Sequence, residues 1–251
     1  MALCDARQTY PPLNSLKPVA SDVWIVDGPL IRFGPALLKL PFPTRMTILR
    51  LGADLFIHSP TALTPELQAE VDAIGSPRWL IGPNRLHYWW IPQWCDAYPK
   101  AAVYLAPRIT EQAAGRLGQL ASRCLPLDRQ SGYPWDGIID TLPVHGGFMS
   151  EVVFFHRATR SLLLTDLIEN FESQKLGLVA RWMTWFGAAQ HPDGQMPRDM
   201  RLNYHDRAEL RSAIDTMLAW NPERIILAHG KWYEQRGADE LRRAFRWLAK
   251  Y

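Results

Sequence analysis

The sequence has no long hydrophobic run. No stretch approaches the roughly 20 consecutive apolar residues that a membrane-spanning helix needs. The N-terminal segment MALCDARQTYPPLN also lacks the basic region followed by an apolar region that marks a secretory signal. From these absences we expect a cytoplasmic protein with no membrane partner.

Cysteine is scarce, and neither sign of charge dominates. Cys4, Cys95 and Cys124 are odd in number and share no close spacing, so neither a disulfide framework nor a CxxC metal site is expected. The net charge of +3 is small and the basic residues are dispersed, which argues against a nucleic-acid partner. A small molecule is therefore the expected partner, and the sequence leaves the oligomeric state open.

Several common catalytic motifs are missing as well. The sequence contains no G-x-S-x-G, no P-loop, no G-x-G-x-x-G and no H-E-x-x-H. These absences argue against a nucleophile-elbow hydrolase, a P-loop nucleotidase, a dinucleotide-binding fold and a zincin protease.

Tryptophan and proline are plentiful, at 11 and 20 of 251 residues, and 47% of the residues are hydrophobic. The segment LHYWWIPQW (86–94) holds three of the tryptophans. We expect these rings to pack a helix against a sheet, and a pocket wall is the alternative.

Strand and helix patterns alternate along the chain. A hairpin is predicted at 23–33 with its turn at Gly28 and Pro29, and a second hairpin at 45–59. Further strands are predicted at 79–83, 102–107, 138–144, 151–156, 161–167 and 224–230, and helices at 64–75, 90–99, 110–121, 171–189, 206–220 and 238–251. Because strands do not alternate with helices throughout, two sheets covered by helices fit better than one parallel sheet.

Potential metal ligands follow the apolar strands, at or beside a turn. They are His58, His87, His145, Asp166 and His229, with Asn84 close to His87. Strand ends are where a rigid scaffold aims side chains at a common site. Neutral imidazoles and carboxylates suit zinc, iron or manganese.

The order of the motifs VHGG, LLLTDL and LAHG resembles the second half of the metallo-β-lactamase superfamily. The front end, YPPLNSLKPVASDVWIVDGPL through PFPTRMTILRL, resembles a subfamily of unknown function, DUF4336. The resemblance covers nearly the whole chain. It implies an α/β (α+β) fold in one domain, residues 1–251: a four-layer αββα sandwich of two mixed β-sheets flanked by helices. It also implies a site of one or two metal ions at the sheet edge, most often used for hydrolysis.

The superfamily's H-x-H-x-D-H motif is degenerate here. Asn84, Leu86, Tyr88 and Trp89 occupy its four positions, and His87 is displaced by one. The resemblance places His145, Asp166 and His229 at ligand positions and puts His58 where the family has an aspartate.

We therefore expect five metal ligands and a pocket beside them. The expected ligands are His58, His87, His145, Asp166 and His229, and the expected pocket residues are Asn84, Trp89, Lys231 and Trp232. Asp166 is also the expected catalytic residue, because it would bridge or orient the attacking water.

Three functions remain open. The first is a metal-dependent hydrolase of esters, amides or phosphoesters, with a remodelled site of one ion or a weak pair. Zinc is the first expectation for the metal, with iron or manganese as alternatives. The second is a non-catalytic relative that has lost the metal and binds a small molecule or a protein. The third is an oxidoreductase that uses non-haem iron.

Overall fold

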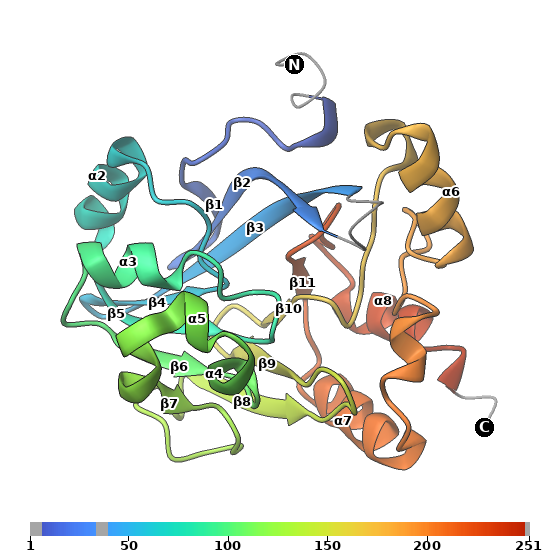
Figure 1. Cartoon of the computed structure of the whole chain (residues 1–251). Coiled ribbons are helices and arrows are strands. Elements are labelled where there is room, and N and C mark those ends of the chain that lie inside the picture. Colours follow the sequence, from blue (N-terminus) through green and yellow to red (C-terminus); the bar gives the residue numbers. More distant parts are fainter. Residues whose placement is uncertain (1–6, 34–39, 249–251) are drawn as a thin grey trace.

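A computed structural model describes residues 7–33 and 40–248. Two mixed β-sheets pack face to face, and helices cover their outer sides (Figure 1). The first sheet has the strand order β1 to β7, and the second has the order β11-β10-β9-β8. This arrangement confirms the predicted four-layer αββα sandwich.

The first sheet changes from antiparallel to parallel pairing at β4. Its strands are β1 Lys17–Ala20, β2 Val23–Phe33, β3 Leu40–Leu51, β4 Asp54–His58, β5 Ser76–Gly82, β6 Ala102–Leu105 and β7 Leu125–Pro126. In the second sheet β8, β9 and β10 pair antiparallel, while β10 and β11 pair parallel. Its strands are β8 Ile139–Val144, β9 Glu151–His156, β10 Ser161–Leu164 and β11 Arg224–Leu227.

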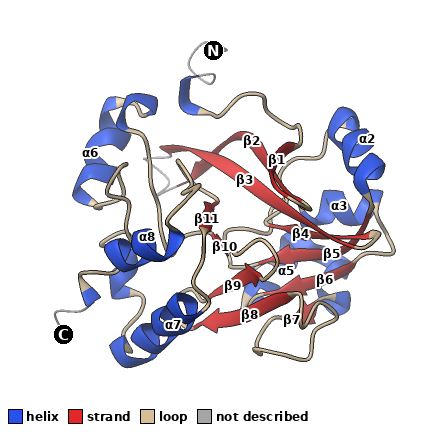
Figure 2. Ribbon diagram, turned by 180° about the vertical axis from the view of Figure 1, so that it is seen from behind, coloured by secondary structure: helices blue, strands red, loops and turns tan. Residues whose placement is uncertain are grey.

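The helices lie on both outer faces of the paired sheets (Figure 2). They are α2 Pro65–Ile74, α3 Ile91–Ala97, α4 Ile109–Gln112, α5 Ala114–Leu117, α6 Leu178–Phe186, α7 Arg207–Ala219 and α8 Gly237–Ala244. Short 3₁₀ turns span Gly118–Arg123, Ser173–Lys175 and Met200–Leu202. No helix among the described residues is long and apolar enough to cross a membrane.

Side-chain caps set where two of the helices begin. Thr64 accepts a hydrogen bond from the backbone N–H of Leu67, with Pro65 at the first turn of α2. Asp206 caps α7 in the same way, by accepting from the N–H groups of Ala208 and Glu209. These starts are the ones that the sequence predicts.

The two sheets share one hydrophobic core. The cluster built on the first sheet also contains Val152, Phe154, Leu163 and Ile226 from the second sheet. Trp135 is fully buried in this cluster, with its ring edge-on to Phe154. Burial of each such side chain contributes roughly 1.5–3 kcal/mol, so the core holds the strand ends of both sheets in a fixed relation.

The predicted first hairpin is wrong, because β2 is one continuous strand. Its pairing with β3 shifts register between Gly28 and Ile31 instead of turning. A Cβ on Gly28 would lie 2.5 Å from the Thr44 hydroxyl, so glycine is needed for this close approach to β3. The irregular register accommodates Pro29, which cannot donate to the ladder.

Three predicted helices are shorter or broken. The helix predicted at 110–121 divides into α4, α5 and a 3₁₀ turn that begins at Gly118, whose φ is +53°. The helix predicted at 171–189 reduces to α6, because Asn170 and Phe171 form β-bridges with Gly230 and Gln190. The closing helix α8 ends at Ala244; the predicted residues 249–251, like Cys4, lie outside the described part of the chain.

Candidate metal centre

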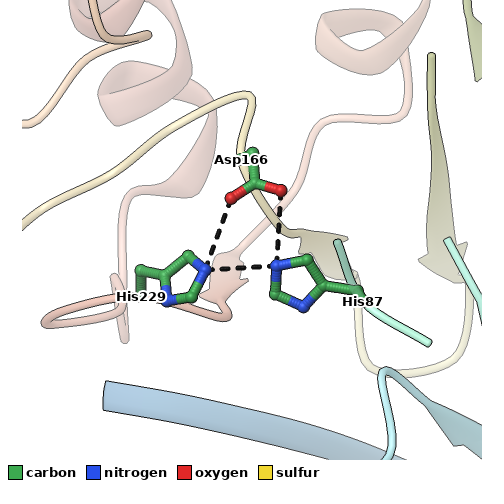
Figure 3. Close-up of side chains that lie close together, drawn as sticks. All are labelled: His87, Asp166 and His229. Carbon is green, nitrogen blue, oxygen red and sulfur yellow. Dashed lines mark hydrogen bonds and ion pairs between the residues drawn. The ribbon is translucent and has the colours of Figure 1, made fainter. Parts of the chain in front are cut away.

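Three side chains from different parts of the chain meet at one edge of the sandwich (Figure 3). The Nε2 atoms of His87 and His229 lie 3.1 Å apart. The Oδ2 of Asp166 lies 3.3 Å from the His87 Nε2, and its Oδ1 lies 3.3 Å from the His229 Nε2. His87 follows β5 of the first sheet, while Asp166 and His229 each follow one of the parallel strands β10 and β11. All three are buried.

Asn84 joins His87 to Asp166. Its side-chain oxygen accepts hydrogen bonds from the backbone N–H groups of Leu86 and His87, at 2.8 and 3.2 Å. Its Nδ2 donates to the Asp166 carboxylate at 2.5 Å and to the Thr165 hydroxyl at 2.8 Å. Asn84 therefore shapes the turn that carries His87 and orients the carboxylate opposite it.

Glu151 fixes the turn that carries Asp166. Its carboxylate accepts hydrogen bonds from the N–H groups of Thr165, Asp166 and Leu167, at 2.6, 2.8 and 3.0 Å. Burial raises the pKa of Glu151, and the nearby Asp166 charge raises it further. Glu151 is not among the residues predicted from the sequence, although an acid at the start of the apolar strand EVVFFH is a visible signal.

Strand β3 holds the loop that carries His229. The His229 Nδ1 donates to the carbonyl of Pro43 at 2.8 Å. The buried Arg45 donates to the carbonyls of Leu227 and Gly230, at 2.7 and 2.8 Å, and pairs with Asp27 at 2.7 Å. Since Nδ1 carries the proton that Pro43 accepts, Nε2 is the atom of neutral His229 that can ligate a metal.

Gly230 has a conformational role in this loop. Its φ is +81°, and a Cβ there would lie 2.2 Å from the carbonyl oxygen of Asn170. Asn170 accepts from the N–H of Lys231 and donates through its side chain to the Lys231 carbonyl, at 2.8 and 2.7 Å. Only glycine allows the segment before α6 to approach the His229 loop this closely.

Burial and mutual contacts shift the pKa values of all three side chains in the cluster. Burial raises the pKa of Asp166, but the charges and hydrogen bonds of His87 and His229 outweigh this and hold it well below its usual range. Burial lowers the pKa of His87 in spite of Asp166. Burial also opposes charge on His229, but its hydrogen bond to Asp166 prevails and raises its pKa. Burial thus favours the neutral ring of His87, with a free lone pair, while Asp166 favours a proton on His229.

Residues 23–190 match a family model described as "Domain of unknown function (DUF4336)". The chain belongs to the DUF4336 family. No curated protein matches it.

Solved metallo-β-lactamases share the fold of this DUF4336 chain. DIM-1 metallo-β-lactamase is 11% identical with a TM-score of 0.61, covering 94% of this chain and 96% of its own. FIM-1 from Pseudomonas aeruginosa, in a mono-zinc form, is 12% identical with a TM-score of 0.58 and coverages of 94% and 95%. A metallo-β-lactamase from Hirschia baltica is 15% identical with a TM-score of 0.59 and coverages of 93% and 97%. The DUF4336 chain therefore has the metallo-β-lactamase fold.

Two of the five expected ligands lie outside the cluster. His145 is exposed after β8, and β9 lies between β8 and the strand that leads to Asp166. His58 ends β4 and is buried against Phe154, with 5.5 Å between ring centroids. Its neighbour Ser59 contacts the site instead, through a 2.7 Å hydrogen bond to the His87 Nδ1. Of the five expected ligands, the structure brings together His87, Asp166 and His229, while His58 and His145 lie outside this cluster.

The expected pocket residues also separate in the DUF4336 structure. Trp89 and His87 line a cavity of about 10 Å³, close to the volume that one water molecule needs. Lys231 is exposed. Trp232 packs against the core between the two sheets and against a second hydrophobic cluster, which lies between the second sheet and helices α7 and α8. Asn84 bonds to the cluster itself. Among the expected pocket residues, Trp89 is thus the one that borders the space next to a candidate ligand.

Proposed function

We propose that this protein is a metal-dependent hydrolase with one divalent ion held by His87, Asp166 and His229. The supporting observation is that these buried side chains bring two imidazole nitrogens and a carboxylate together, with the nitrogens 3.1 Å apart and each 3.3 Å from a different oxygen of Asp166. Ligands about 2.0–2.2 Å from a zinc ion, at tetrahedral or octahedral angles, lie roughly 2.9–3.5 Å from one another. The spacing of these three side chains is therefore close to that of ligands sharing one ion, with one ligand atom from each residue within 4.8 Å of the others.

The ligand chemistry limits the identity of the ion. Two imidazoles and one carboxylate suit zinc, iron or manganese, and zinc is the first candidate. When bound, such an ion supplies Lewis acidity, which polarises a carbonyl or phosphoryl oxygen and lowers the pKa of water towards about 7. The mono-zinc form of FIM-1 is consistent with a single zinc ion in a fold of this kind.

The protein's own groups would orient water and hold a proton. Asp166 is fixed by Asn84 and by Glu151, so its carboxylate can orient a water molecule at the cluster. Burial raises the pKa of the half-buried Glu169 to about 8, with His229 opposing and Asp166 adding to the shift. Its raised pKa makes Glu169 a candidate acid for a leaving group of an ester, amide or phosphoester, a role that also requires its carboxyl to reach the cluster.

The test is metal-dependent turnover. Protein stripped with a chelator and reconstituted with zinc, manganese or iron is assayed with nitrophenyl esters and bis(nitrophenyl) phosphate. We expect turnover that Asp166→Asn and His229→Ala each reduce at least about 100-fold, because each removes a ligand. The matched control is His145→Ala, which should retain wild-type turnover because His145 is exposed and outside the cluster. Equal loss in the control would refute the three-residue assignment.

A second candidate is a non-catalytic metal protein or ligand-binding relative. The observation that favours it is closure of the site, since His87, Asp166 and His229 are 8%, 4% and 5% exposed. A non-catalytic metal protein predicts bound metal without turnover of any of these substrates, and a ligand-binding relative that has lost the metal predicts neither metal nor turnover. The same residue set also resembles the two-histidine, one-carboxylate centre of non-haem iron enzymes, and iron-dependent dioxygen consumption without ester turnover would favour that function.

A further inference from the structure

Helix α6 exposes its large apolar side chains. Leu178, Trp182, Trp185 and Phe186 are 75%, 60%, 59% and 59% exposed. Val179 and Met183 are exposed beside them. The side of the helix that faces the protein consists of Ala180 and Thr184. In a helix packed on a core the large apolar residues face inward, so α6 has the reverse arrangement.

The exposed residues form one continuous surface. Leu178, Trp182, Trp185 and Phe186 have the spacing i, i+4, i+7 and i+8, which is one helix face. The rings of Trp182, Trp185 and Phe186 contact one another, with centroids 4.8 to 6.1 Å apart. Fully buried aromatic side chains each cover about 150–250 Å², so these rings alone expose roughly 270–450 Å², about the largest patch of a typical monomer.

Two cations lie beside this face. Lys175 and Arg181 fall within residues 173–192, which hold no aspartate or glutamate, while Glu172 and Asp193 border the segment and Asp193 pairs with Arg243 and Arg246. Arg181 is exposed on α6, and its Nε donates to the Ser173 carbonyl at the flank of the helix. An apolar face rich in tryptophan, phenylalanine and leucine, flanked by cations, is typical of helices that lie in a membrane interface.

We propose that α6 docks this protein on the surface of an anionic phospholipid bilayer. Leu178, Trp182, Trp185 and Phe186 would enter the boundary between headgroups and acyl chains, while the exposed Arg181 contacts lipid phosphates. The helix lies along the surface and does not span the bilayer. The proposal departs from the sequence-based expectation of no membrane partner, and it is independent of the proposed metal centre.

A second copy of the chain fits this face less well. In a two-fold dimer the same small patch of both copies meets, which brings the two Arg181 side chains to one interface. A stable interface also needs about 800 Å² from each partner, while a nine-residue helix is only about 14 Å long. A bilayer covers the apolar face without bringing two Arg181 side chains together and without an interface of about 800 Å² per partner.

The experiment is vesicle flotation of the full chain. The vesicles contain phosphatidylcholine alone or phosphatidylcholine mixed with phosphatidylglycerol. We expect the protein to float with the mixed vesicles, to bind phosphatidylcholine more weakly, and to lose part of its binding at high salt. The triple variant Trp182→Ser, Trp185→Ser, Phe186→Ser should bind the mixed vesicles at least about tenfold more weakly.

The controls separate lipid binding from misfolding and from self-association. Leu125→Ser is the control, because it also removes an exposed apolar side chain. Leu125 is 43% exposed on β7, which lies on the other side of the molecule from α6 (Figure 1), so this variant should bind vesicles like the wild type. Thermal melts should show both variants folded. Failure of the wild type to float, or unchanged binding by the folded triple variant, would overturn the proposal. A dimer that the triple variant converts to monomer, without flotation, would overturn it in favour of a second copy.

Discussion

At the scale of one residue, His58 shows that a histidine can match the sequence pattern of a metal ligand and still lie outside the candidate metal centre. It ends an apolar strand, as His87 and His229 nearly do, and the sequence therefore predicts a ligand. The structure buries it between the sheets, 3% exposed, with no hydrogen-bond partner for its Nε2. Burial lowers its pKa to about 3, so the folded state holds the neutral ring.

A buried neutral histidine makes stability depend on pH. Its pKa is about 3 in the folded state and 6.5 ordinarily, so the unfolded state binds more protons below 6.5. Stability is therefore lost as the pH falls from 6.5 towards 3, by about 2 kcal/mol near pH 5. We expect His58→Leu to remove this part of the pH dependence and to change stability little at neutral pH, where the leucine replaces an unpaired ring.

Urea unfolding of the wild type and the variant at several pH values measures this effect. The difference between the two proteins should grow as the pH falls from 6.5. A constant difference across that range would show that His58 is not held neutral by burial.

Sequence pattern identified residues of the site but not their connections. His87, Asp166 and His229 were predictable because each lies beside the end of an apolar strand. The hydrogen bonds of Asn84 and Glu151 to the Asp166 turn were not, because they join segments that are distant in the chain and depend on the packing of two sheets. His145 lies outside the cluster for a similar reason. The order of the strands in the second sheet, which depends on long-range pairing, places β9 between β8 and β10.

At the scale of the element, β3 is the strand that connects the first sheet to the loop of His229 in the candidate metal centre. Pro43 and Arg45 both bind the loop after β11, and Arg45 is 3% exposed beside Asp27. Lys17 also contacts Asp27, at 2.8 Å. Local patterns predicted strands here but mistook the irregular register of β2 for a turn, because a glycine and a proline mark both features.

The hydrogen bonds of Arg45 to the His229 loop predict how much stability and zinc affinity the variant Arg45→Met loses. The variant loses the two hydrogen bonds to the His229 loop and leaves Asp27 with Lys17 alone. Breaking a buried ion pair costs about 3–5 kcal/mol, and we expect the lower end because Lys17 remains. Zinc affinity should also fall roughly 10-fold or more, because the His229 loop loses its anchor.

Denaturant unfolding and competition with a chelating dye measure the two effects. Arg50→Met is the matched control on the same strand, because Arg50 pairs with Asp22 where both side chains are partly exposed. That change should stay within about 1 kcal/mol and leave the zinc affinity unaltered. Equal losses in the two variants would show that β3 does not position His229 through Arg45.

At the scale of the whole molecule, the superfamily resemblance predicted the sandwich, and the structure confirms it. The chain has this fold although it is only 11–15% identical to DIM-1, FIM-1 and the Hirschia baltica enzyme. That one domain spans residues 1–251 stays a prediction. A fold of this kind survives extensive change because its two sheets need only apolar inner faces. A metal centre does not, because it depends on particular atoms at particular distances. For this reason the degenerate H-x-H-x-D-H motif left the site much less predictable than the fold.

The most direct test of the metal centre is the metal content of the purified protein. Protein prepared without chelator, and again after dialysis against zinc, manganese or iron, is analysed by inductively coupled plasma mass spectrometry. The account predicts about one ion per chain in the wild type and in His145→Ala, and a loss of that ion in His87→Ala and in Asp166→Asn. A wild-type stoichiometry near zero that no added metal restores, or a loss caused by His145→Ala alone, would contradict it.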